Sequence, residues 1–151
     1  MTETVTTLQI VPAIEFVVRG TPQPKGSARA FKHNGSGRVI VWADNRGRLK
    51  VWESCVRAAA LRVRPRDRFY GPVGLTVRFE LARPKSATPA KRPHPHVKPD
   101  LSKLLRGIED ALSGILYNDD AQIVQVRCEK TYCPADQEPG AVVTVIALGG
   151  R

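Results

Sequence analysis

The sequence predicts a single α/β domain of the α+β kind, in which one mixed β-sheet is covered by two helices. Three observations support this. The chain has 151 residues, the length of one ordinary domain. Apolar residues make up 42% and charged residues 25%, as in a folded soluble protein. Apolar positions alternate in several short segments and recur with helical spacing in two longer ones. The domain is expected to span residues 13–151, after a loose threonine-rich lead-in over residues 1–12.

The first half of the domain is expected to form two strands and a helix. Residues 14–18 and 39–42 are short apolar runs that favour strands. Between them, residues 25–32 combine small and basic side chains, which is typical of a loop. Residues 48–64 carry apolar side chains at three- and four-residue spacing, which predicts an amphipathic helix.

The second half contributes a strand, a helix and two further strands. Residues 74–82 alternate apolar and polar side chains, as a half-buried strand does. Residues 83–99 are rich in proline and basic residues, and we interpret them as a long surface loop of functional importance. A helix over residues 100–114 and strands over residues 122–132 and 141–148 follow. The predicted order is therefore β-β-α-β-α-β-β.

Charge divides the chain into two unequal parts. Residues 1–99 hold 19 of the 24 Lys and Arg residues and 6 of the 14 Asp and Glu residues. Residues 100–151 hold the remaining 5 basic and 8 acidic residues. A basic body is thus followed by an acidic C-terminal third. This asymmetry indicates a polyanionic partner for the body and a separate role for the carboxylates.

Several classes of protein are excluded by the same composition. No apolar run approaches the about 18 residues that a membrane-spanning helix needs, and the N-terminus does not resemble a signal peptide. The three cysteines include no C-x-x-C pair, so neither a disulfide framework nor a cysteine zinc site is supported. We expect a protein of the reducing cytoplasm.

The carboxylates of the acidic third are the candidate functional groups. Asp100 precedes an apolar helical stripe, where an aspartate most often caps a helix. The adjacent pair Asp119 and Asp120 would, taken alone, most often mark a turn. Adjacent carboxylates repel each other unless a cation or a basic group relieves them. Such pairs are also ligands of Mg²⁺, whose remaining positions are filled by water and phosphate oxygens.

Three segments carry a resemblance to a known family. Residues 98–112 read KPDLSKLLRGIEDAL, residues 117–124 read YNDDAQIV, and residues 20–29 read GTPQPKGSAR. Together they resemble the RusA family of Holliday junction resolvases. The pattern of that family is approximately P-D-x-D-N-x-x-K-x-x-x-D-A-L followed by D-D-x-Q-[VI], with an N-terminal loop of the form G-x-P-x-P-K-x-x-x-R. The resemblance extends over about residues 14–148, with the parts in the same order.

The resemblance implies a Mg²⁺-dependent endonuclease, with Mn²⁺ as an alternative ion, that cuts four-way DNA junctions as a homodimer in recombination and repair. Many members are encoded by phages and act in the cytoplasm of a bacterial host. Asp100 matches the first aspartate of the metal motif, and Asp120 matches the aspartate from the D-D pair, beside Asp119. Asp110 matches the helix aspartate, and Arg106 stands where the family has a functional lysine.

Two positions depart from the family pattern. Ser102 replaces the second motif aspartate, and Lys103 replaces the asparagine. The loss of a carboxylate weakens a Mg²⁺ site unless Asp110 or Asp119 compensates for it. The alternative is a protein that binds branched DNA with little or no catalysis. A basic protein associated with RNA or the ribosome is a third interpretation, but it leaves the spaced carboxylates unexplained.

Basic residues in two loops are candidates for phosphate contacts, which give affinity without sequence information. The competing interpretation is an ordinary solvated surface. His94 and His96 form an H-x-H pair, but no third ligand stands near them in the sequence, so we favour a phosphate contact or a plain loop over zinc. The candidate DNA-binding residues are Lys25, Arg29, Lys32, Arg83, Lys85, Lys91, Arg92, Lys98 and Lys103.

Overall fold

The main sheet has four strands in the order β1-β6-β4-β5. The computed structural model describes residues 12–26, 29–32, 34–42 and 45–149. Strands β1, β6 and β4 pair antiparallel, and β4 pairs parallel with β5. The elements in chain order are β1 (Ala13–Arg19), β2 (Arg29–Lys32), β3 (Val39–Trp42), α1 (Arg46–Val63), β4 (Val73–Leu81), α2 (Leu101–Leu112), the 3₁₀ turn η1 (Asp120–Gln122), β5 (Ile123–Tyr132) and β6 (Gly140–Ala147).

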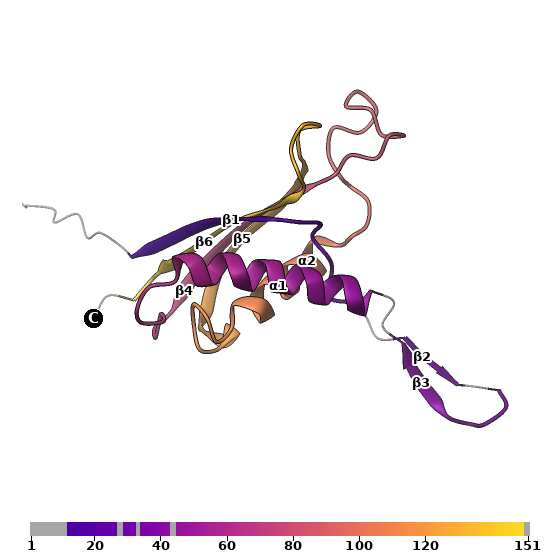
Figure 1. Ribbon diagram of the computed structural model, residues 1–151, viewed down its shortest axis with the longest axis horizontal. Coiled ribbons are helices and arrows are strands. Elements are labelled where there is room, and N and C mark those ends of the chain that lie inside the picture. The colour runs from indigo at the N-terminus through magenta and orange to yellow at the C-terminus, as the bar shows by residue number, and fades with distance from the viewer. Residues whose placement is uncertain (1–11, 27–28, 33, 43–44, 150–151) are drawn as a thin grey trace, which may run out of the picture.

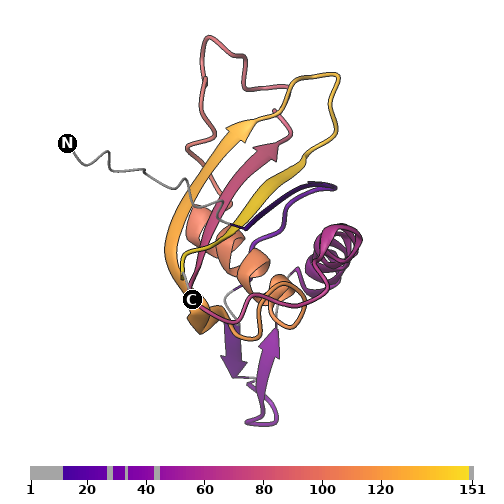
Figure 2. The same cartoon turned by 90° about the vertical axis from the view of Figure 1, so that its left-hand side faces the viewer.

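Both helices cover the same face of this sheet (Figures 1 and 2). The parallel pair β4 and β5 requires a crossover connection, and α2 supplies it. Alternate side chains of the strands, such as Leu75, Val77 and Val143, point to the helices and are fully buried. The predicted mixed sheet with two covering helices is thereby confirmed.

The apolar stripes of the two helices are buried as their spacing predicts. In α1 the buried side chains are Trp52, Val56 and Ala60, four residues apart. In α2 the stripe of Leu104, Ile108 and Leu112 has the same spacing. Helix α2 stops at Ser113, and the following residue, Gly114, has a φ of +85°, the left-handed conformation that favours glycine after a helix. No helix in the described part of the chain is long and apolar enough to span a membrane.

The β2–β3 hairpin differs from the expected arrangement. The predicted basic loop over residues 25–32 contains the short strand β2, which pairs antiparallel with β3. The two form a separate ribbon that projects beyond the end of α1, away from the main sheet (Figure 1). The predicted strand over residues 39–42 is confirmed as β3. Strand β2 was missed because its four residues are too few for a period of two to stand out in the sequence. The predicted lead-in over residues 1–12 lies outside the described residues except for Pro12.

The proline-rich segment between β4 and α2 has no helix or strand, as expected, and internal contacts fasten it. The Arg83 guanidinium donates hydrogen bonds to the carbonyl oxygens of Ala87 and Arg92 and lies 4.1 Å from the centre of the Tyr132 ring. Arg83, a candidate for DNA contact, is therefore engaged inside the protein. The Nζ atom of Lys130 on β5 donates to the carbonyl oxygens at positions 97 and 99, at 2.7 and 2.8 Å.

Candidate active site on helix α2

Asp100 occupies the N-cap position of α2, but its side chain makes no capping hydrogen bond. The backbone there is extended, and 53% of the side chain is exposed. Its carboxylate oxygen lies 3.6 Å from Nζ of Lys103, which belongs to the first turn of the helix. The ordinary explanation of this aspartate, a helix cap, therefore does not account for it. The carboxylate is open to a ligand.

The loop that follows β1 is fastened along α2. The backbone N–H of Lys25 donates to the carbonyl oxygen of Lys103 at 3.0 Å, and its Nζ atom forms an ion pair with Asp110. The side-chain amide of Asn45 donates to the carbonyl oxygen of Pro24 at 2.7 Å. Two residues that the sequence assigned to different roles, Lys25 to DNA and Asp110 to a metal, are thus each other's partner. Asp110 is correspondingly less available as a ligand.

The two aspartates after α2 have unequal environments. The Asp119 side chain accepts a hydrogen bond from the N–H of Ala121 at 2.8 Å, and the side-chain oxygen of Gln122 accepts from the N–H of Asp119, which completes a capping box. The hydrogen bond from Ala121, and then one with Asp120, lower the pKa of Asp119. Asp119 is therefore engaged in holding the turn. Asp120, which is also exposed, comes next in the chain.

A fifth carboxylate, Glu109, belongs to the same neighbourhood and was missed by the sequence reasoning. Burial raises the pKa of Glu109, the negative charge of Asp120 raises it further, and Arg106 partly offsets this. On α2, Arg106 follows Ser102 by four residues, and Glu109 follows it by seven. The three side chains therefore share one stripe of the helix. Ser102 stands at the position of the missing aspartate. The seven-residue spacing from Ser102 is the signal in the sequence that would have identified Glu109.

Negative charge at the C-terminal end of α2 also raises the pKa of two groups in or beside the core. The buried Tyr117 hydroxyl donates to the backbone oxygen of Glu109 at 2.9 Å. Burial, followed by the charges of Glu109 and Asp120, strongly raises the pKa of Tyr117. Burial, followed by Glu109 and Glu129, raises the pKa of Cys128 to about 11. The charges gathered here are therefore poorly compensated within the protein.

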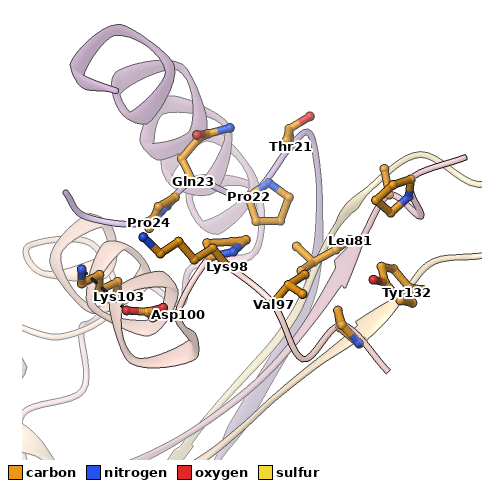
Figure 3. A pocket seen from close by; sticks show the side chains of 14 residues that line it. Thr21, Pro22, Gln23, Pro24, Leu81, Val97, Lys98, Asp100, Lys103 and Tyr132 are labelled. Carbon is orange, nitrogen blue, oxygen red and sulfur yellow. Dashed lines mark ion pairs between the residues drawn. The ribbon is translucent and has the colours of Figure 1, made fainter. Parts of the chain in front are cut away.

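At the other end of α2, Asp100 and Lys103 border a cavity of about 480 Å³ (Figure 3). The loop after β1 provides one wall, and the ends of β4 and β5 together with residues 95–99 provide the others. Its lining is Thr21, Pro22, Gln23, Pro24, Leu81, Ala82, Pro84, Pro95, Val97, Lys98, Pro99, Asp100, Lys103 and Tyr132. The exposed carboxylate of Asp100 thus lies beside both a recess and a cation.

The carboxylates suit a hard divalent cation in their chemistry, because oxygen atoms are the ligands that Mg²⁺ prefers. No group of three or more His, Cys, Asp or Glu side chains arranged to hold a metal is found in the described part of the chain. Asp100 and Glu109 are nine residues apart on α2, about 13 Å along its axis. The repulsion between Glu109 and Asp120, which Arg106 offsets only in part, is the feature that a cation would relieve.

The remaining predicted residues lie in the loops and the hairpin. Lys91 and Lys98 are exposed, and Arg92 is partly buried. Arg29 and Lys32 are on β2, and their side chains are outside the described part. His94 and His96 are exposed, and a ring nitrogen of His96 lies 3.1 Å from the carbonyl oxygen of His94.

Comparison with known proteins identifies the family. Residues 20–146 match the family model of the endodeoxyribonuclease RusA, which covers most of the chain. The chain is also 29% identical over 141 residues to YqaN of Bacillus subtilis strain 168, a protein described as uncharacterized. That alignment covers 87% of this chain and 94% of YqaN. The matched region includes the loop after β1, both helices and the carboxylates of the site. The chain belongs to the RusA family of endodeoxyribonucleases.

Proposed function

We propose that this protein is a divalent-metal-dependent endonuclease that resolves four-way DNA junctions by paired cleavage of the phosphodiester backbone. One observation supports the proposal independently of the family match. Asp100, at the first motif position, neither caps its helix nor is buried, and it is exposed beside a basic side chain and a cavity. A carboxylate whose described structural role is an exposed ion pair with Lys103 is available to bind a ligand.

Asp100 and Asp120 are the proposed ligands of Mg²⁺ or Mn²⁺. Such an ion polarises a phosphoryl oxygen and lowers the pKa of an attacking water. Mg²⁺ keeps several of its waters, so the carboxylates need not all contact it directly. Asp119 caps a turn and Asp110 pairs with Lys25, so both are better suited to support than to ligation. Glu109, which feels the charge of Asp120, adds a further carboxylate at the C-terminal end of α2.

The basic residues have complementary tasks in this proposal. Arg106, on the stripe of Glu109, stabilises negative charge that develops on the phosphate. Lys103 and the lysines of the proline-rich loop hold neighbouring phosphates. A four-way junction has approximate two-fold symmetry, so a symmetric dimer presents one site to each of two strands. Cleavage of both strands in one complex follows from that symmetry.

A second candidate function is suggested by Ser102, which lacks the charge of the family's aspartate. A site with too little negative charge would bind Mg²⁺ weakly, and the protein would then recognise branched DNA without cutting it. The two candidates share the DNA partner and differ only in catalysis.

The test is cleavage of a labelled synthetic four-way junction in Mg²⁺ and in EDTA. We expect paired nicks in Mg²⁺ and none in EDTA. Asp100→Asn and Asp120→Asn should each slow cleavage by about 100-fold or more, because each removes one charge from the metal site. The matched control is Asp136→Asn, which makes the same charge change in the exposed loop between β5 and β6. Junction binding without nicks in any divalent ion would favour the second candidate, and full activity of Asp100→Asn would overturn the assignment of that residue.

A further inference from the structure

The cavity beside Asp100 has two chemically different ends. At one end Lys98, Lys103 and Asp100 gather, and at the other Leu81, Val97 and Tyr132 form an apolar wall (Figure 3). Its volume of about 480 Å³ falls within the range of cavities that enclose a small organic molecule. This combination indicates a ligand that is flat and apolar in one part and anionic in the next.

The apolar end has the composition of a stacking site. Five prolines line the cavity together with the ring of Tyr132. Proline and tyrosine rings are rigid, so they present flat surfaces that lose little conformational entropy when a ligand binds. Heterocyclic bases that leave a helical stack are held on aromatic and apolar side chains of this kind.

The wall also contains a polar group without a partner. The hydroxyl of Tyr132 is buried, and no group in the described part of the chain forms a hydrogen bond with it. The Arg83 guanidinium lies on the ring and holds it in place. The hydroxyl is closed off from solvent, so Tyr132 contributes the flat surface of its ring to the cavity wall.

The cationic end provides the connection to the site. Lys98 is exposed at the rim, and Lys103 lies 3.6 Å from the Asp100 carboxylate. Two ammonium groups at the mouth of an apolar recess match a nucleotide, whose phosphate is joined to its base through one sugar. A base in the recess would leave its phosphate among Lys98, Lys103 and Asp100.

We propose that this cavity receives a single unstacked nucleobase of the DNA strand that Asp100 helps to cleave, with the ring of Tyr132 as part of the wall that holds it. The proposal rests on the proposed function for its strand, but base capture itself requires no cleavage. Capture fixes the backbone of the strand relative to the site. A base inside an intact duplex must lose its pair and both stacking neighbours, whereas a base at the exchange point of a junction is less completely stacked and leaves at lower cost.

The test uses four-way junctions in which 2-aminopurine, a base whose fluorescence rises when it leaves the stack, replaces one base at a time around the exchange point. Binding is measured in EDTA, so that the DNA stays intact. We expect wild-type protein to raise the fluorescence several-fold at one position in each of two opposite strands. Val97→Trp, which fills the recess, should abolish the rise. The control is Leu61→Trp, on α1 and outside the cavity, whose original side chain has a similar exposure of 49% against 42% for Val97.

The outcomes separate this proposal from the proposed function. Mg²⁺-dependent cleavage without a fluorescence rise at any position, or with a rise that Val97→Trp retains, would overturn base capture and leave the nuclease intact. The opposite outcome is a fluorescence rise that Val97→Trp abolishes and Leu61→Trp retains, in a protein that does not cut the junction in Mg²⁺. That result would support base capture and reject the nuclease.

Discussion

The two ends of α2 carry charged groups in contrasting states. At the N-terminal end, Asp100 and Lys103 are about half exposed, lie 3.6 Å apart and border a cavity. At the C-terminal end, Asp110 pairs with Lys25, and Glu109 is partly buried near Asp120, which raises its pKa. The first end thus holds groups that are hydrated and available. The second holds groups whose charge the protein itself compensates only in part.

This contrast indicates a division of labour along the helix. Negative charge that is partly desolvated and repelled by a neighbour gains most from a bound cation. We therefore expect the carboxylates at the C-terminal end, Asp120 and Glu109, to contribute more to metal affinity than Asp100 and position 102 do. The exposed N-terminal end, with its lysines and its recess, suits the DNA strand. The following predictions test this division, from the largest expected effect to the smallest.

The largest difference is expected between Asp120→Asn and Asp110→Asn. Asp120→Asn should reduce junction cleavage by about 100-fold or more at an unchanged melting temperature, because it removes a proposed metal ligand that is exposed. Asp110→Asn breaks the ion pair with Lys25 and should lower the melting temperature by about 2 °C, with less than about tenfold loss of activity. Cleavage rates and thermal melts measure both. Equal losses of activity would make Asp110 a ligand in its own right.

Ser102→Asp restores the carboxylate of the family pattern and should strengthen metal binding. We expect the Mg²⁺ concentration for half-maximal cleavage to fall by about three- to tenfold, since affinity rises with the charge of the ligands. The control is Ser102→Asn, whose side chain has the shape of aspartate without its charge, and it should give no such gain. If Ser102→Asp also has no effect, another group already supplies the missing charge.

Much of the fold could be predicted from the sequence because its helices have long, regular stripes. The spacing of Leu104, Ile108 and Leu112 predicted the buried face of α2, and Gly114 marked its end. In the β2–β3 ribbon, the strand over residues 39–42 was predicted, but β2 and the pairing of the two strands were not, because four residues that mix small and basic side chains carry no strand pattern.

The candidate site was predictable in its residue types but not in their partners. The motif located Asp100 and Asp120, but only the folded chain shows that Asp100 does not cap its helix. The ion pair of Lys25 with Asp110 joins residues 85 positions apart, and no local pattern announces it. Glu109 was missed because its environment depends on the return of the chain at Asp120.

Glu109→Gln should stabilise the protein slightly at neutral pH. The raised pKa means that the folded state binds the proton of Glu109 more tightly than the unfolded state does. This carboxyl group therefore lowers stability as the pH rises from the ordinary pKa of 4.5 through the raised value. We expect the variant to melt about 1–2 °C higher than wild type at pH 7. The difference should vanish below pH 4.5, where both states are protonated. Glu138→Gln, in the exposed β5–β6 loop, is the control, and a variant less stable than wild type at pH 7 would contradict the assigned environment of Glu109.

The smallest effect is a change in the reactivity of Cys128, which reports the charge at the C-terminal end. Its pKa of about 11 leaves roughly one thiol in a thousand ionised at pH 8, so alkylation should be slow. Glu109→Gln removes one cause of that raised pKa and should speed alkylation by a few fold, as measured by mass spectrometry of the Cys128 peptide with Cys55 as internal reference.

A divalent ion bound near Glu109 and Asp120 would act in the same direction, because its positive charge also favours the thiolate. Mg²⁺ should therefore accelerate alkylation of Cys128 in wild type but not in Asp120→Asn. If cleavage needs Mg²⁺ while Cys128 does not respond to it, the ion binds nearer to Asp100, and the division of labour along α2 is the reverse of the one inferred.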